Sequence, residues 1–360
     1  MIRSVLKGAA RTVVSHWPDY TRLMPLTEGA QWVIDEEMRE VGRVARSLGI
    51  RVVSPRWLGC SSRQCVFYGS HFFLLGGDWR LHDHRIATAY FHGRPGSGVE
   101  EFDVVYKRLC ESHPRIGRVQ VSHAQMREVV LASGIAKEKV FLIPIGINLE
   151  HFQRFPADVR LKTRRELGVP ESAFVVGSFQ KDGVGWGDGM DPKLIKGPDV
   201  FLRTLEALKP RIPELWVLLS GPARGYVKQG LERLGIPYRH RYLKRYADIG
   251  KLYRALDVYL VTSRQEGGPK AVLESLASGV PLVTTAVGQA LDLVRHRENA
   301  WMTPVEDVEG LAHWTQWIHE HPSDVERTRP EGLRTAEENT YDKQIPLWKN
   351  FFDGFVSARA

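Results

Sequence analysis

The chain has 360 residues, a length that suits two domains, and its content of 43% hydrophobic and 26% charged residues is typical of a globular protein. It contains no apolar run of the roughly 18 residues that a membrane span needs and no signal-peptide pattern, so we expect a cytoplasmic protein. The formal charge of +8 favours anionic partners such as nucleotide phosphates or anionic lipid headgroups. Because no nucleic-acid motif accompanies that charge, nucleic acid is a disfavoured partner.

Metal and disulfide chemistry find little support in the sequence. The three cysteines, Cys60, Cys65 and Cys110, lack a zinc spacing, so reduced thiols are the favoured interpretation. The segment His82-Asp83-His84 resembles metal ligands by residue type only, and a solvated loop is favoured there. We therefore predict no metal site.

The first half of the chain alternates between helical and strand patterns. Residues 1–14 carry an apolar stripe beside basic residues, which fits either a helix on a membrane surface or, as we favour, a helix packed on its own domain. We expect helices over 30–47 and 124–133. The expected strands cover 23–28, 50–53, 66–75, 85–94 and 119–122. This alternation predicts a doubly wound parallel sheet, with His92 at the end of one strand.

The second half begins with a strand over 174–179, followed by a glycine-rich insertion over 181–192. That insertion suggests a mobile flap that carries Trp186, with a passive surface loop as the alternative. Further strands are expected over 215–221 and 237–243, and a helix over 245–255.

The most informative stretch runs from residue 256 to 285 and predicts a strand, a glycine loop, a helix and a second strand. Pro269 suits the first helical position and Gly279 suits the position just past the helix end. Unpaired N–H groups at such a helix start attract anions, including diphosphates. Glu266 in the loop and Glu274 in the helix should face one small volume, where carboxylates accept hydrogen bonds from sugar hydroxyls.

Glu266 and Glu274, with seven residues between them, resemble the E-x7-E signature of retaining glycosyltransferases of the GT-B fold, family GT4. The sequence reads Glu266-Gly267-Gly268-Pro269 where the family usually has Glu-Gly-Phe-Gly. The resemblance implies an α/β protein of two facing Rossmann-like domains with a cleft between them. An acceptor domain would cover 1–155, with the helix over 345–360 packing back on it, and a donor domain would cover 156–344.

The resemblance also implies roles for individual residues. Lys196 would stabilise the leaving diphosphate, Glu266 and Glu274 would hold sugar and ribose hydroxyls, and His92 would face the sugar. Ser178 stands where the family has a cation, and Lys181 is the expected substitute, with a solvated loop lysine as the alternative. The other expected donor-binding residues are Gly267, Gly268, Pro269, Lys270, Gly221, Tyr242 and Leu243.

The implied activity is transfer of a sugar, with retained configuration, from a UDP-sugar or, next in preference, a GDP-sugar. The acceptor would be a glycan, such as a polysaccharide, a lipid-linked intermediate or a small molecule, and no cofactor or essential metal is expected. Peripheral contact with an anionic membrane is a further expectation. A GT-B pseudoenzyme serving as a partner subunit, which Ser178 favours, and a sugar-nucleotide epimerase are the alternatives. Hydrolysis by the carboxylate pair is disfavoured because both acids lie on one element.

Overall fold

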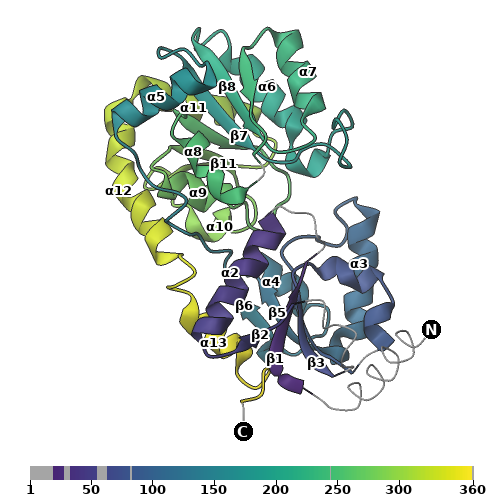
Figure 1. Cartoon of the computed structure of the whole chain (residues 1–360). Helices are drawn as coiled ribbons and strands as arrows, with labels where there is room; N and C mark the ends of the chain where they lie inside the picture. The colour runs from purple at the N-terminus through teal and green to yellow at the C-terminus, as the bar shows by residue number, and fades with distance from the viewer. Residues whose placement is uncertain (1–18, 28–32, 55–62, 82, 244, 359–360) are drawn as a thin grey trace, which may run out of the picture. The chain divides into compact units, whose positions relative to one another are not determined.

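The computed structural model describes residues 19–27, 33–54, 63–81, 83–243 and 245–358 (Figure 1). The chain forms two compact units: the first comprises Met1–Ile145 and Tyr341–Ala360, and the second comprises Gly146–Thr340. The boundaries expected from the sequence, after residues 155 and 344, lie somewhat further along the chain. The stripe over 1–14, Cys60 and His82 fall outside the described residues.

The first unit contains a parallel sheet with the strand order β2-β1-β3-β4-β5-β6. Its strands are β1 (Asp19–Leu26), β2 (Arg51–Val52), β3 (Gln64–Tyr68), β4 (Arg85–Ala89), β5 (Ile116–Val121) and β6 (Val140–Leu142). Its helices are α2 (Val33–Ser47), α3 (Glu100–Ser112), α4 (Ala124–Leu131) and α13 (Ile345–Phe352). Alternate strand residues contribute to two apolar clusters. Helices α2 and α13 pack with Phe67 in one cluster, and helices α3 and α4 pack with Ile86 in the other.

In the first unit, one expectation was wrong and one helix was not predicted. The strand expected over 66–75 ends at Tyr68, and His71–Leu75 forms a 3₁₀ helix whose first turn is capped by Ser70, which accepts a hydrogen bond from the Phe72 N–H. The apolar residues alone did not distinguish a strand from a 3₁₀ helix over 71–75, because the apolar run is short. Helix α3 was not expected, although Phe102, Val105 and Leu109 have helical spacing and are buried.

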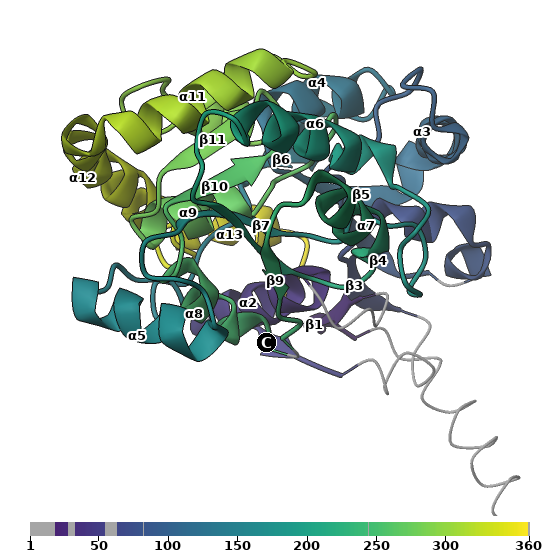
Figure 2. The ribbon, with the colours of Figure 1, turned by 90° about the horizontal axis from the view of Figure 1, so that it is seen from above.

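The second unit contains a parallel sheet with the order β12-β11-β10-β7-β8-β9. Its strands are β7 (Phe174–Phe179), β8 (Leu215–Ser220), β9 (Tyr238–His240), β10 (Val258–Val261), β11 (Leu282–Thr285) and β12 (Trp301–Thr303). The helices are α5 (Ala157–Leu167), α6 (Pro198–Leu208), α7 (Gly225–Leu234), α8 (Gly250–Tyr253), α9 (Ala271–Ala277), α10 (Ala290–Leu293), α11 (Val308–Glu320) and α12 (Pro322–Glu338). Figure 2 shows α6 and α7 on one side of this sheet and α8 and α9 on the other.

Both sheets are therefore parallel and carry helices on both faces, so the predicted α/β class with doubly wound sheets is confirmed. Since all strands of the second sheet run in one direction, its loops divide into two sets. We call the side where strands end the carboxyl edge and the side where they begin the amino edge. Within the described residues, no helix is both long enough and apolar enough to cross a membrane.

Candidate functional site

The stretch from β10 to β11 has the local structure that the sequence predicts. β10 is fully buried and pairs in parallel with β11. The turn before α9 is already helical at Pro269, whose carbonyl accepts from the Val272 N–H at 2.9 Å. Gly279 follows the helix in a left-handed conformation, with φ of 66°. The loop over 262–270 consequently lies at the carboxyl edge of the sheet.

Glu266 and Lys196 form an ion pair at this edge. Lys196 Nζ lies 2.6 Å from Glu266 Oε2, and the Ser263 hydroxyl donates to Glu266 Oε1 at 2.8 Å. The Glu266 side chain is 9% exposed and that of Lys196 is 23% exposed. The structure therefore brings together two of the predicted catalytic residues, and solvent still reaches the cation.

The segment that carries Lys196 is fastened to the loop after β10. Gly197 has φ of 62°, and a Cβ there would lie 1.9 Å from the Thr262 carbonyl oxygen, so only glycine fits. Thr262 Oγ1 donates to the Gly197 carbonyl at 2.9 Å. The N–H groups of Arg264 and Gln265 both donate to the Ile195 carbonyl. These bonds hold Lys196 beside Glu266 although 70 residues separate them in the chain.

Glu274 has an environment of its own. It is only 4% exposed, and it accepts hydrogen bonds from the Tyr246 hydroxyl and, at 2.9 Å, from the Tyr253 hydroxyl. Burial raises the pKa of this carboxyl, while the two hydroxyls and the nearby Lys270 act in the opposite direction. The carboxylates of Glu266 and Glu274 thus have separate sets of partners, which the sequence did not predict.

The glycine loop itself is closely packed. The Gly267 carbonyl accepts from the Gln289 N–H at 3.2 Å, so the loop after β11 lies against it. Pro269 is buried and Gly268 is half-buried. Lys270 is 6% exposed, and its Nζ lies 4.9 Å from the centre of the Tyr246 ring. The roles of these residues in donor binding stay predictions.

Position 178 lies beside a cation that the sequence did not reveal. Ser178 is buried, and both its hydroxyl and its carbonyl accept hydrogen bonds from Arg224. Arg224 also donates to the carbonyls of Gln180 and Ser220, and its Nε lies 3.1 Å from Asp182 Oδ1. Burial raises the pKa of Asp182, and the Arg224 charge opposes that shift. Since the Arg224 side chain is completely buried, this cation holds the strand ends together.

The glycine-rich insertion is packed against the start of α7. The Gly225 N–H donates to the Asp188 carbonyl at 2.7 Å, and the Tyr226 N–H donates to the Gly189 carbonyl at 2.9 Å. Trp186 is 58% exposed, and Lys181 Nζ lies 3.9 Å from the centre of its ring. Burial lowers the pKa of Lys181. The interpretation as a flap and the role of Lys181 on the diphosphate stay predictions.

The remaining predicted site residues lie on several different elements. Gly221 follows β8, with its carbonyl oxygen 2.8 Å from His240 Nε2, while Tyr242 is exposed and Leu243 is half-buried after β9. In the first unit, His92 lies after β4 in an aromatic cluster, with ring centres 5.4 Å from His71 and 5.5 Å from Phe102. The predicted approach of His92 to the sugar stays a prediction.

A metal centre finds no support in the part of the chain that the structure describes. In these residues, no group of three or more His, Cys, Asp or Glu side chains could hold a metal ion. Metal-independent chemistry remains an expectation.

Comparison with known proteins identifies the second unit. Residues 192–334, which include Lys196, Glu266 and Glu274, match the family described as glycosyl transferases group 1. This match covers most of the second unit.

Curated proteins similar to this chain include proteins named as sugar transferases from several bacteria. The lipopolysaccharide core biosynthesis mannosyltransferase LpsB of Rhizobium meliloti is 29% identical over 156 residues, which cover 41% of this chain and 41% of that protein. The D-inositol 3-phosphate glycosyltransferase of Saccharomonospora viridis is 32% identical over 193 residues, which cover 49% of this chain and 41% of that protein. The enzyme of the same name from Corynebacterium urealyticum is 26% identical over 269 residues, which cover 68% of this chain and 59% of that protein. The chain therefore matches less than two thirds of the length of each relative.

Solved structures match over nearly the whole chain. Anabaena HepE in complex with UDP-glucose has a TM-score of 0.74 at 16% identity, covering 92% of this chain and 99% of that one. Sucrose-phosphate synthase from Thermosynechococcus elongatus has a TM-score of 0.71 at 16% identity, covering 92% and 98%. At this identity the likeness concerns the fold, and the predicted GT-B class, with one Rossmann-like domain in each unit, is confirmed.

Proposed function

We propose that the protein is a retaining glycosyltransferase that moves a sugar from a nucleotide-diphosphate sugar, with UDP-sugars favoured over GDP-sugars. The observation that carries this proposal is the Lys196–Glu266 pair at the carboxyl edge of the group 1 domain. Ligands of open α/β sheets bind at that edge. The match to HepE, which was solved with UDP-glucose, supports the same donor class.

In this proposal, binding of the donor opens the ion pair. The Lys196 ammonium moves to the departing diphosphate and stabilises the negative charge that develops there. Glu266 stays in place because Ser263 donates to its other oxygen at 2.8 Å, and it accepts hydrogen bonds from sugar hydroxyls near the reacting carbon. The leaving phosphate itself would take the proton of the acceptor hydroxyl, so the mechanism needs no separate base.

Glu274 would hold the ribose from a more rigid position. Tyr246 and Tyr253 orient its carboxylate, and ribose hydroxyls would bind it by replacing or sharing the hydrogen bond from Tyr246. A tyrosine hydroxyl that reorients exchanges one hydrogen bond for another, so the donor can reach Glu274 at modest cost. His92 would contact the opposite side of the sugar, and no metal takes part.

The acceptor class is broader in this proposal than the donor class. A glycan, a lipid-linked intermediate or a small molecule would accept the sugar, and peripheral contact with an anionic membrane would accompany a lipid-linked acceptor. The net charge of +8 supports anionic partners of either kind.

A non-catalytic role is the second candidate, and Ser178 is the observation that favours it. The cation beside this position, Arg224, has a completely buried side chain and makes hydrogen bonds to three carbonyl groups. It is therefore poorly placed to meet a diphosphate. A partner subunit that binds nucleotide sugars without turning them over would have this arrangement.

Donor hydrolysis and donor binding separate the two candidates. The purified protein is screened by thermal shift against UDP-, GDP- and dTDP-sugars, since a bound donor raises the unfolding temperature. Release of nucleotide diphosphate is then followed for the wild type and for Glu266→Gln. Glu206→Gln is the matched control, because Glu206 is exposed on α6 of the same unit.

Turnover that is lost in Glu266→Gln and kept in Glu206→Gln supports the transferase. Binding without turnover in the wild type supports the partner subunit. Neither binding nor turnover with any of these donors would reject both.

A further inference from the structure

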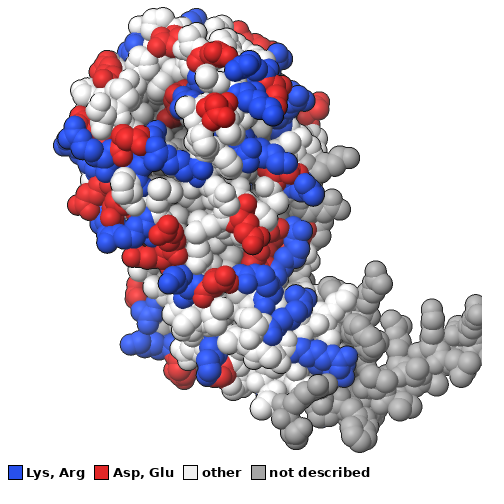
Figure 3. Space-filling model, turned by 60° about the vertical axis from the view of Figure 1, so that its left-hand side comes forward, with Lys and Arg blue, Asp and Glu red and all other residues white. Residues whose placement is uncertain are grey.

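The amino edge of the second sheet carries an unusual concentration of arginines. Five of them gather around the segments that lead into β7, β10 and β11. They are Arg154, Arg160, Arg164, Arg254 and Arg329. Figure 3, which turns α5 and α12 toward the viewer, shows Lys and Arg side chains in a band across this face. We call these five side chains the arginine cluster.

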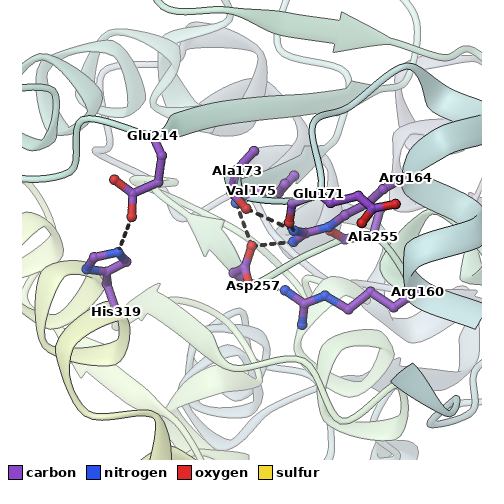
Figure 4. Close-up of polar contacts among 9 residues, drawn as sticks. All are labelled: Arg160, Arg164, Glu171, Ala173, Val175, Glu214, Ala255, Asp257 and His319. Atoms are coloured by element: carbon purple, nitrogen blue, oxygen red, sulfur yellow. Dashed lines mark hydrogen bonds and ion pairs between the residues drawn. The ribbon is translucent and has the colours of Figure 1, made fainter. Parts of the chain in front are cut away.

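In the part of the chain that the structure describes, two carboxylates form ion pairs with the cluster. Asp257 pairs with Arg160 and Arg164, which reach it from α5 (Figure 4), and it also accepts from the Val175 N–H at 2.7 Å. Glu326 pairs with both Arg154 and Arg329. Among the described residues, the five arginines therefore have two carboxylates as ion-pair partners within 4.0 Å.

Two of the five arginines, Arg160 and Arg164, pair with Asp257 and so connect α5 to the start of β10. Arg164 is 3% exposed and donates to the carbonyls of Ala255, Glu171 and Ala173 as well as to Asp257. Arg160 is the second partner of Asp257. Asp257 is therefore paired with Arg160 and Arg164. Among the described residues, Glu326 is the one carboxylate that pairs within 4.0 Å with any of the other three arginines of the cluster.

Arg254 differs from the others because no carboxylate oxygen lies within 4.0 Å of it among the described residues. Its guanidinium lies 3.6 Å from the centre of the Phe155 ring, and Glu166 acts on it only from a longer range. Arg329 is repelled by Arg154 and Arg160, which lower its pKa together with the larger effect of burial. Like charges held this close are unfavourable unless an anion joins them.

A cavity of about 180 Å³ opens among these side chains. Arg154, Arg160, Arg254 and Arg329 line it, and no Asp or Glu does. Ser278 also lines it; its hydroxyl is buried and has no hydrogen-bond partner in the described part of the chain. The start of α5, at Ala157, adds backbone N–H groups on the same side. Its volume lies below the roughly 300 Å³ of ordinary small-molecule pockets, which suits a group the size of one phosphate.

We propose that this cavity is a second ligand site that binds a phosphate-type dianion, either as a free phosphate ester or as the headgroup of a phospholipid. Guanidinium groups bind phosphate oxygens through paired N–H donors, and four arginines line this cavity. The site lies at the amino edge, while Lys196 and Glu266 follow the carboxyl ends of the strands. It is therefore separate from the proposed donor site and does not depend on the proposed activity.

Phosphate titration of the full chain tests this proposal. Binding of inorganic phosphate is measured by calorimetry at constant ionic strength, in the wild type and in Lys196→Gln, which removes the cation of the carboxyl edge. Arg254→Gln is the main variant, since it leaves no unpaired acid behind. Arg233→Gln is the matched control, because Arg233 is exposed on α7 of the same unit.

We expect one phosphate to bind the wild type and Lys196→Gln equally well. Arg254→Gln should bind it about tenfold more weakly or worse, the usual effect of a lost charged hydrogen bond. Arg233→Gln should bind it like the wild type. Circular dichroism confirms folding of each variant, and Arg154→Gln replaces Arg254→Gln if the latter does not fold. The proposal is overturned if the wild type binds no phosphate, or if binding is lost in Lys196→Gln and kept in Arg254→Gln.

A vesicle arm distinguishes the two sources of phosphate. The same proteins are sedimented with phosphatidylcholine vesicles that contain or lack phosphatidic acid. Sedimentation that needs phosphatidic acid and is lost only in Arg254→Gln identifies a lipid headgroup. Phosphate binding without sedimentation identifies a free phosphate ester. Equal sedimentation of Arg254→Gln and Arg233→Gln reflects net charge and rejects the lipid source.

Discussion

The two edges of the second sheet both carry charged residues, but they balance charge differently. At the carboxyl edge, Lys196 and Glu266 form a one-to-one pair 2.6 Å apart. At the amino edge, five arginines share Asp257 and Glu326. A ligand at the first edge has to open an existing pair, whereas a ligand at the second would supply a missing charge. The difference teaches that two edges of one sheet can bind anions for different reasons, by exchange of a partner at one edge and by addition of a partner at the other.

One residue contributes to both edges. Tyr253 lines the cavity of the arginine cluster, and its hydroxyl donates to Glu274 at 2.9 Å. Burial and the Glu274 carboxylate both hold the pKa of Tyr253 well above its usual value, so this hydroxyl remains a donor at neutral pH.

The largest expected effect concerns the acid that organises the amino edge. Asp257→Asn removes the partner of Arg164, whose side chain is 3% exposed, and should lower the free energy of unfolding by about 3–5 kcal/mol. Urea unfolding measures the loss. Glu298→Gln, which breaks the exposed pair with Arg295, is the control and should change stability by less than about 1 kcal/mol. Added phosphate should restore part of the stability of Asp257→Asn; an equal loss in both variants would contradict the organising role of Asp257.

The next largest effect concerns turnover at the carboxyl edge. Lys196→Ala should lower kcat about a hundredfold, or roughly 2.7 kcal/mol, because charge stabilisation of the leaving group acts mainly in the transition state. The donor dissociation constant should change much less. Steady-state kinetics and calorimetry with the best donor of the thermal-shift screen measure both quantities. An unchanged kcat would remove Lys196 from the mechanism.

A smaller effect is expected for the buried acid of the same edge. Glu274→Ala should weaken nucleotide binding by about 1–3 kcal/mol, the cost of a lost charged hydrogen bond. Calorimetric titration with the nucleoside diphosphate measures the change. Tyr246→Phe is the companion variant, because it removes one donor to Glu274 and keeps the ring. Unchanged affinity in Glu274→Ala would reject the ribose role.

The smallest effect is a pH dependence of stability. Because burial raises the pKa of Glu274 above 4.5, the folded state holds this proton more tightly than the unfolded state. The contribution of Glu274 to the free energy of unfolding is therefore fully present below pH 4.5, and it is lost as the pH rises toward the folded-state pKa. The free energy of unfolding should fall by no more than about 1.4 kcal/mol per pH unit in this range. The unfolding temperature of the wild type should fall relative to that of Glu274→Gln over this range. Parallel curves for the two proteins would argue against the raised pKa.

Local patterns predicted much of the second unit. Apolar β-rich runs such as 258–261 and 282–285 form buried parallel strands as expected. The order of strand, glycine loop and helix also placed Glu266 at the carboxyl edge. These features follow from residues that are close in sequence, so their physical causes can be read there.

The side-chain partners could not be predicted in the same way. Arg224 reaches Ser178 across 46 residues, and Tyr253 reaches Glu274 across 21. The arginine cluster joins α5 to Asp257 across more than 90 residues. No spacing rule applies to such pairs, because the crossover connections of the sheet decide which segments meet.

The sequence alone determined that this protein has parallel α/β sheets and an E-x7-E loop, because strand periodicity, helix caps and glycine turns are local properties. Only the tertiary structure decided what each charge faces. It paired Glu266 with Lys196, enclosed Glu274 between two tyrosines and gathered five arginines at the opposite edge. Electrostatic energy depends on distance and burial, and folding sets both.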